Sequence, residues 1–159
     1  MNILLTGSTG FIGSNIAQRL VNKNKLFIII RNKKKNSIFK HKNIKIINFS
    51  NYENLGKKLT RIKVNTVIHA ATHYVKNHNI KDLQKLANSN ILLGNIILEN
   101  LSNMKVKKFI NFSTVWEDFN GIKNNFFNLY ATYKKAFSLL IDYYEKKEKK
   151  IKFYKLMIS

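Results

Sequence analysis

The chain has no cysteine and no proline among its 159 residues. Without cysteine, neither a disulfide framework nor a thiolate metal site can form, and the redox compartment cannot be inferred from cysteine spacing. Four scattered histidines do not favour a zinc site either, so we expect no bound metal. Hydrophobic residues make up 45% and charged residues 23% of the chain. These fractions are typical of a globular protein, and the length suits one domain that covers residues 1–159.

Long hydrophobic runs are also missing. The longest, residues 26–30 and 91–93, are far shorter than the roughly 20 residues that a membrane-spanning helix needs. The first residues, MNILLTG, lack the basic start and apolar stretch of a signal peptide. We therefore expect a cytoplasmic protein with no membrane partner.

Acidic residues are scarce, 8 against 29 basic ones, which gives a net charge of +21. Such a balance favours polyanion partners, but arginine is almost absent, with only Arg19, Arg31 and Arg61. Proteins that read bases or clamp phosphates favour the forked guanidinium of arginine. Here the basic residues are mostly dispersed lysines, and the chain is also rich in Asn and Ile. A bias towards A/T-rich codons would produce this composition. We expect weak, salt-dependent attraction to polyanions and no specific nucleic-acid partner.

Short apolar segments alternate with longer amphipathic ones along the chain. This alternation is typical of a parallel sheet covered by helices. The last predicted helix, for example, repeats apolar residues at Phe137, Leu140 and Tyr144. The predicted strands are residues 3–6, 26–31, 44–48, 66–70, 109–113 and 151–157, and the predicted helices are residues 11–22, 52–58, 81–103 and 129–147.

Three of the six glycines form a GxxGxxG motif directly after the first predicted strand. In a strand–turn–helix unit, Gly7 permits the tight turn, Gly10 lets the backbone approach a pyrophosphate, and Gly13 lets helix and strand pack closely. A diphosphate then lies on free N–H groups at the helix N-terminus. The alternative is a turn that uses glycine for conformational reasons alone. The predicted cofactor-binding residues of this turn are Thr6, Gly7, Thr9, Gly10, Phe11, Ile12 and Gly13.

The second predicted strand ends in Arg31, which Asn32 and lysines 33 to 35 follow, and residues 26–51 contain no acidic residue. An acidic residue at this place accepts from the 2′-hydroxyl of NAD, whereas a basic one suits the 2′-phosphate of NADP. The pattern favours NADP(H) over NAD(H), although a chain this basic can also place Arg31 there by chance.

Four residues form a candidate catalytic set. Ser113 and Thr114 end the fifth predicted strand, and Tyr130 and Lys134 lie four apart on one face of the last predicted helix. A nearby ammonium lowers the pKa of a phenol towards the range useful for acid–base catalysis, and a strand-end hydroxyl can bind the same reacting oxygen. Alone, the YxxxK spacing is equally typical of a helix tyrosine beside a solvated lysine. The order of the motifs favours the catalytic interpretation.

These residues resemble the extended short-chain dehydrogenases and reductases, which include NAD(P)-dependent epimerases and dehydratases of nucleotide sugars. The similarity runs through NILLTGSTGFIGSNIAQRL, TVIHAAT, SNILLGNIILEN, KKFINFSTVW and NLYATYKKAF, and is closest to the branch with CDP-abequose synthase-like reductases. With the alternating pattern, the resemblance implies an α/β fold, a Rossmann-like doubly wound parallel sheet of about six strands.

The resemblance also assigns roles to individual positions. It implies catalysis by Thr114 (or Ser113), Tyr130 and Lys134, with Lys134 also bonded to the nicotinamide ribose. Further cofactor contacts are implied at His69, Ala70, Ala71 and Thr72, and a supporting helix position at Asn90.

Three departures from the family pattern matter. The loop after Ser113 and Thr114 is shorter than usual, and a gap-free count from Phe109 favours Thr114 as the catalytic hydroxyl. The acidic pair that dehydratases carry directly after that hydroxyl is absent, since Glu117 and Asp118 come later, which favours epimerisation or keto reduction over 4,6-dehydration. The usual Asp near the adenine is missing from residues 48–51.

The chain ends at Ser159, whereas family members continue for about as many residues again in a C-terminal domain that binds the nucleotide sugar. We therefore expect that substrate domain to be absent. The leading hypothesis is an NAD(P)-dependent epimerase or reductase acting on a nucleotide sugar, with Tyr130 as acid–base. The alternatives are a truncated NADP(H)-binding remnant or half-enzyme, completed by a homo-oligomer or a separate chain, and a basic nucleic-acid-binding protein.

Overall fold

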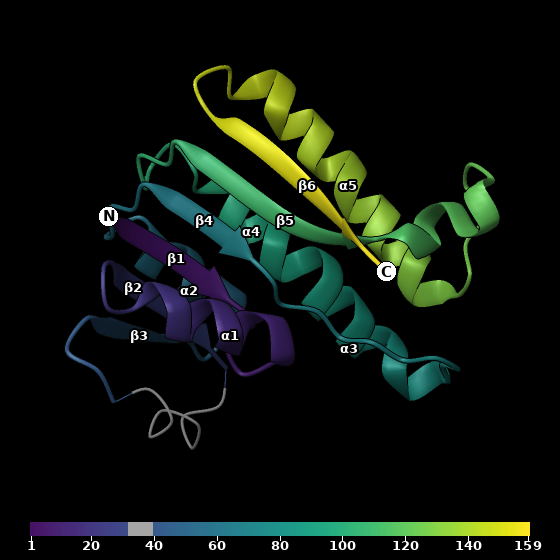
Figure 1. Ribbon diagram of the computed structural model, residues 1–159, viewed down its shortest axis with the longest axis horizontal. Coiled ribbons are helices and arrows are strands. Elements are labelled where there is room, and N and C mark those ends of the chain that lie inside the picture. The colour runs from purple at the N-terminus through teal and green to yellow at the C-terminus, as the bar shows by residue number, and fades with distance from the viewer. Residues whose placement is uncertain (32–39) are drawn as a thin grey trace.

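The computed structural model describes residues 1–31 and 40–159, and their six strands form one parallel sheet in the order β3-β2-β1-β4-β5-β6 (Figure 1). All neighbours pair in parallel, and helices lie in the connections from β1 to β2, β3 to β4, β4 to β5 and β5 to β6, as the alternating pattern predicts. The predicted α/β, Rossmann-like sheet is confirmed. The strands are β1 (Asn2–Thr6), β2 (Lys25–Ile30), β3 (Ile44–Asn48), β4 (Thr66–His69), β5 (Lys108–Thr114) and β6 (Lys152–Ile158).

The helices lie where the amphipathic segments predicted them, with local differences. The first, α1, ends two residues early, and the helix expected over residues 81–103 is continuous from Leu83 to Glu99, with a π-helical turn in its middle. A short 3-10 segment, η4, follows β5 in a stretch for which no helix was predicted. The segments are α1 (Phe11–Leu20), α2 (Tyr52–Leu59), η2 (Ile80–Asp82), α3 (Leu83–Ala87), the π-helical η3 (Asn88–Leu92), α4 (Leu93–Glu99), η4 (Val115–Gly121) and α5 (Leu129–Lys147).

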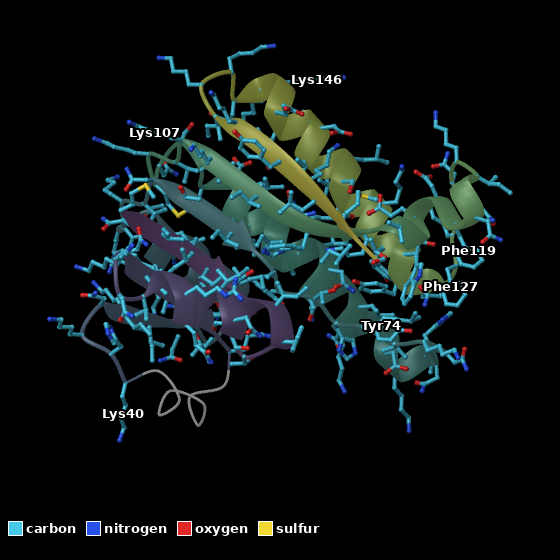
Figure 2. The ribbon with its side chains drawn as sticks, in the orientation of Figure 1. Lys40, Tyr74, Lys107, Phe119, Phe127 and Lys146 are labelled. Carbon is cyan, nitrogen blue, oxygen red and sulfur yellow. The ribbon has the colours of Figure 1, made fainter. Side chains whose placement is uncertain are left out.

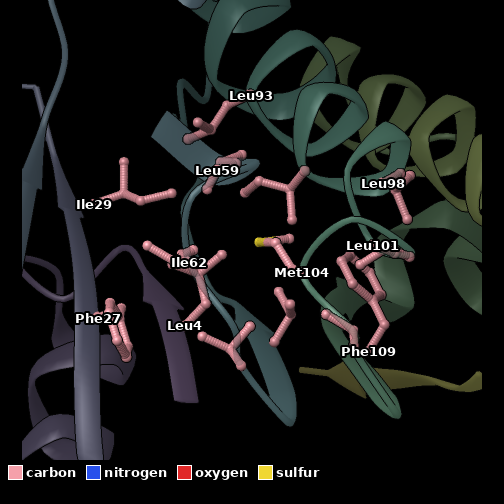
Figure 3. Packing of buried hydrophobic residues seen from close by; sticks show 14 of the residues in the cluster. Leu4, Phe27, Ile29, Leu59, Ile62, Leu93, Leu98, Leu101, Met104 and Phe109 are labelled. Carbon is pink, nitrogen blue, oxygen red and sulfur yellow. The ribbon is translucent and has the colours of Figure 1, made fainter. Parts of the chain in front are cut away.

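The two faces of the sheet bury separate hydrophobic clusters, because successive side chains of a strand point to opposite faces. The larger cluster includes Leu4, Phe27 and Phe109 and packs against α2, α4 and α5; Figure 3 shows part of it. The smaller includes Leu5 and Ile28 and packs against α1. In Figure 1, α1 crosses one face of the sheet and α2 and α4 lie behind the other.

The edge strand β6 leaves apolar surface exposed. Among the described residues, Tyr154, Leu156 and Met157 are 43 to 50% exposed on this strand. An exposed apolar edge strand favours association with another chain or another segment.

The described segments contain no helix that is long and apolar enough to cross a membrane. The same residues contain no cluster of three or more His, Asp or Glu side chains that could hold a metal ion.

Candidate functional site

Two of the motif glycines are required by close backbone approaches. Gly7 has a φ of +72°, and a Cβ there would lie 2.4 Å from the carbonyl oxygen of Ala70. A Cβ on Gly13 would lie 2.2 Å from the carbonyl oxygen of Gly7. The turn at the end of β1 therefore packs against both α1 and the end of β4 with no space for a side chain at either position.

Gly10 has a different role at the start of α1. It is the N-cap residue, in extended conformation, and no side chain caps the helix. The first N–H groups of an α-helix have no partner within the helix and carry the positive end of its dipole. The bare backbone at Gly10 therefore leaves an anion-binding helix N-terminus uncovered, as the motif predicts.

A cavity of about 540 Å³ lies over this helix N-terminus. It reaches from the glycine turn to Arg31 at the end of β2 and to Thr72 after β4. Ile29, Ile30 and Leu93 also line it; their apolar side chains carry no chemical signal that sequence analysis could detect. The predicted cofactor residues that line the cavity are Gly7, Thr9, Gly10, Phe11, Ile12, Gly13, Arg31, Ala70, Ala71 and Thr72.

A larger hollow, of about 740 Å³, lies elsewhere, at the end of the sheet where β5 and β6 begin. Lys107 and Lys152 line it, and it contains none of the predicted cofactor residues. Figure 2 labels Lys107 near that end, far from the glycine turn. We place the candidate site in the smaller cavity because only there does an uncapped helix N-terminus face the space.

Thr6 and His69 are buried below the cavity instead of lining it. The Thr6 hydroxyl accepts from the Ala71 N–H at 3.1 Å and lies 2.9 Å from His69 Nδ1. Burial, followed by the charge of Lys134, lowers the pKa of His69 to about 3. A neutral imidazole can accept the Thr6 proton, so this pair fixes the end of β4 against the glycine turn.

Asn90 supports the loop after β4. Its amide oxygen accepts from the Thr72 hydroxyl at 2.8 Å and from the His73 N–H at 2.9 Å, while its amide nitrogen donates to the His73 carbonyl at 3.0 Å. Asn90 is 2% exposed and lies in the π-helical segment η3. π-Helical turns are frequent at functional sites, and this one directs an amide at a loop that borders the cavity.

Arg31 borders the cavity at the end of β2. One guanidinium nitrogen donates to the Ser89 hydroxyl at 3.1 Å, which directs the side chain across the cavity mouth towards η3. The other N–H groups of the guanidinium have no hydrogen-bond partner among residues 1–31 and 40–159. Asn32 and lysines 33 to 35, which also entered the NADP(H) prediction, lie outside the described residues.

Tyr130 and Lys134 lie on the first turns of α5. The side chain of Asn128 caps this helix by accepting from the Ala131 N–H at 3.0 Å. Lys134 is 4% exposed, and its ammonium donates to the Phe112 carbonyl of β5. Burial lowers the pKa of Lys134 to about 8, while the negative charge of Glu117 acts in the opposite direction.

The pKa of Tyr130 is raised, whereas the YxxxK spacing predicted that Lys134 would lower it. Burial is the largest cause; the side chain of Thr72 acts in the opposite direction, and the charges of Glu117 and Tyr74 raise the pKa further. The ammonium of Lys134 is directed to the backbone carbonyl of Phe112 and does not contribute to this shift.

The two candidate hydroxyls at the end of β5 have different partners. Ser113 is 2% exposed and donates to the carboxylate of Glu117, which sequence analysis did not include in the site. The Thr114 hydroxyl accepts from the Trp116 N–H at 3.3 Å, and its own proton has no partner among the described residues. Thr114 is therefore the hydroxyl with a free donor, although the structure does not bring it into hydrogen-bond contact with Tyr130.

Aromatic side chains extend from Tyr130 along the loop that follows β5. The ring of Tyr74 meets Tyr130 edge-on, with 5.2 Å between centroids, and Trp116 lies 5.7 Å from Tyr74. Phe127 continues the series 5.1 Å from Trp116. Figure 2 labels Tyr74 and Phe127 at this end of the molecule. These rings give the phenol an apolar surrounding, which accounts for its burial.

Comparisons with known proteins agree with this arrangement. The model of the "NAD dependent epimerase/dehydratase family" matches residues 3–159. The chain is 30% identical over 150 residues to CDP-abequose synthase of Yersinia pseudotuberculosis, covering 92% of this chain and 51% of that protein. It is 35% identical over 123 residues to dTDP-D-glucose 4,6-dehydratase of Dictyostelium discoideum, covering 70% and 28% respectively.

Solved structures share the fold at low sequence identity. The UDP-Glc/GlcNAc 4-epimerase of Campylobacter jejuni matches with a TM-score of 0.84 and 17% identity, over 98% of this chain and 52% of that one. The UDP-glucuronic acid 4-epimerase of Bacillus cereus, in complex with UDP-glucuronic acid and NAD, matches with a TM-score of 0.80 and 24% identity, over 99% and 56%. The chain spans about half the length of these proteins, or less. It belongs to the NAD dependent epimerase/dehydratase family.

Proposed function

We propose that this chain is the dinucleotide-binding half of an NADP(H)- or NAD(H)-dependent epimerase or reductase that acts on a nucleotide sugar. One observation carries the proposal: the uncapped N-terminus of α1, behind a glycine turn with no space for side chains at Gly7 or Gly13, faces a cavity that Thr72 also lines. The side chain of Thr72 also acts on the pKa of Tyr130, which relates the cavity to the candidate acid–base group.

The residues fit a dinucleotide on structural grounds. The turn leaves no space for a Cβ at Gly7 or Gly13, and the helix behind it begins without a side-chain cap at Gly10. A diphosphate resting on this backbone would receive N–H donors from the start of α1. When bound, the nicotinamide would supply or accept the hydride, and the protein would supply the proton.

The proton chemistry is assigned to residues of this chain. Tyr130, like any phenol, holds its proton at neutral pH and can donate it to a carbonyl oxygen as that oxygen is reduced. Burial raises its pKa and so makes it a weaker acid. Thr114 has a free hydroxyl proton to donate to the same oxygen, and Lys134 fixes α5 against β5 through the Phe112 carbonyl. This arrangement favours keto reduction, or the reductive half of an epimerisation.

The preference for NADP(H) is the finer part of the proposal. Arg31 borders the cavity and its guanidinium is bonded to Ser89, the one partner it has within the part of the chain that the structure describes, and residues 26–51 supply no carboxylate for a ribose 2′-hydroxyl. Fluorescence titration of NADPH and NADH should give tighter NADPH binding. Arg31→Gln should reduce the NADPH-to-NADH affinity ratio by about tenfold, since a hydrogen bond to a charged group contributes roughly 1.5–3 kcal/mol. An unchanged ratio would contradict the assignment.

A second candidate is a cofactor-binding remnant or half-enzyme. The chain spans only 51% and 28% of two curated relatives, and the edge strand β6 exposes apolar side chains that another copy or a separate chain would cover. This candidate predicts dinucleotide binding without turnover. The test is to follow nicotinamide absorbance after mixing the chain with NADPH and a 4-keto nucleotide sugar, with Tyr130→Phe as the control. If NADPH is oxidised by the unmodified chain and not by Tyr130→Phe, the result supports an enzyme. If NADPH binds and is not oxidised, the result supports a half-enzyme.

A further inference from the structure

Glu117 is the only carboxylate that the described residues bury, with a 3% exposed side chain. It lies in η4, three residues beyond Thr114, on a loop that is shorter than the family pattern. A buried carboxylate is costly unless hydrogen bonds or a cation compensate for lost hydration. Its retention next to the candidate catalytic residues therefore requires partners, and the structure provides them.

The partners of Glu117 come from two elements. The Ser113 hydroxyl, at the end of β5, donates to its Oε1 atom. From α5, the Ser138 hydroxyl donates to the same oxygen at 3.5 Å, and Lys135 Nζ lies 4.0 Å from Oε2. Glu117 thus connects the strand that carries Thr114 to the helix that carries Tyr130.

The same carboxylate acts on Lys134. The titratable groups that interact with this buried ammonium come from two elements: His69 from β4 and Glu117 from η4. His69 is neutral at physiological pH, so Glu117 is the anion of the two. Its charge favours the ammonium form of Lys134, whereas burial disfavours it.

We propose that Glu117 is a positioning residue of the catalytic site, a proposal that rests on the proposed function. Its carboxylate fixes the end of β5 against α5 and stabilises the ammonium of Lys134. Ser113 is then a structural donor, because its hydroxyl serves Glu117, and Thr114 is the hydroxyl left for the substrate. The proposal assigns separate roles to two neighbouring hydroxyls that the sequence motif could not distinguish.

The first test follows the 13Cε signal of Lys134 through a pH titration, with the signal assigned from its loss in Lys134→Arg. In Glu117→Gln, which keeps the side-chain shape and removes the charge, the titration midpoint should fall by about one pH unit, the low end of the effect of a nearby charge. The matched control is Asp118→Asn. Asp118 lies 3.7 Å from Lys135 and is 40% exposed, so its removal should leave the midpoint in place. Equal midpoints in Glu117→Gln and the unmodified chain would overturn the proposal.

The second test needs no variant and so does not depend on how well Glu117→Gln folds. In the unmodified chain, nuclear Overhauser contacts should join the side chain of Glu117 to the β-protons of Ser113 and Ser138. Their absence would overturn the bridge between β5 and α5. Neither experiment requires cofactor or turnover, so failure of the proposed function would appear separately, as an unmodified chain that binds no dinucleotide.

Discussion

The substitution Gly13→Ala tests whether the glycine turn is packed as tightly as the structure shows. The new methyl carbon would lie 2.2 Å from the carbonyl oxygen and 2.5 Å from the carbonyl carbon of Gly7, and 2.8 Å from the nitrogen of Ser8. All three are backbone atoms, and favourable contacts need roughly 3.5–4.0 Å. Helix α1 would therefore have to move away from the turn.

Two opposing effects decide the magnitude. Replacing a helical glycine by alanine stabilises by about 1 kcal/mol, whereas overpacking costs about 1–3 kcal/mol and more when backbone must move. Because Gly13 meets three backbone atoms, we expect net destabilisation of about 2 kcal/mol. For a chain of this size this corresponds to a melting temperature lower by about 4–8 °C.

The matched control is Gly10→Ala in the same turn. Its methyl carbon would meet only the Gly7 carbonyl oxygen, at 3.3 Å, in an extended conformation that alanine adopts freely. The poorer N-cap and the lower entropy of the unfolded chain nearly cancel, so we expect a change within about 0.5 kcal/mol. Thermal unfolding followed by circular dichroism measures both variants. Equal melting temperatures for the two would refute the close packing of turn and helix.

Three further predictions concern the rest of the molecule. Burial lowers the pKa of His69 from 6.5 to about 3, so between these pH values the unfolded chain binds more protons than the folded one. The free energy of unfolding should therefore fall as the pH drops from about 6.5 towards 3. Urea unfolding at a series of pH values should show a weaker dependence of this free energy on pH in His69→Gln. Binding to single-stranded DNA should weaken steeply as salt rises from 50 to about 200 mM, and affinity that persists at the higher salt would support a nucleic-acid partner instead. Leu156→Lys, on the exposed edge strand β6, should reduce self-association in analytical ultracentrifugation. The control is Tyr143→Lys on α5, at a residue that is 60% exposed against 45% for Leu156, and an equal effect of both would argue against association through the edge.

The sequence was informative where one local rule decides the structure. All six predicted strands are present, because runs such as residues 26–30 are apolar on both faces and suit only the interior of a parallel sheet. The glycine turn was also predictable, because the spacing of the three glycines reflects the backbone geometry of the turn. The π-helical turn within the helix predicted over residues 81–103 left no such signal, although the side chain of Asn90 in this turn is bonded to Thr72 and His73.

The electrostatics of the candidate site depended on three-dimensional contacts. The four-residue spacing of Tyr130 and Lys134 placed them on one helix face, but burial decides the direction of both pKa shifts. Glu117 was taken as a residue displaced from a family motif, because nothing in the sequence shows that its carboxylate is buried against Ser113. His69 was expected along the cofactor and is instead buried below the cavity.

The central claim, that a diphosphate binds to the bare backbone at the start of α1, is tested most directly by NADH and NADPH titration of the unmodified chain and of Gly10→Asp. Aspartate is a favourable N-cap residue, so this variant should keep its fold while placing a carboxylate at the diphosphate position. Like charges brought together cost several kcal/mol, so the dissociation constant should rise by more than about a hundredfold. Equal affinity in both proteins, or no dinucleotide binding by the unmodified chain, would contradict the account.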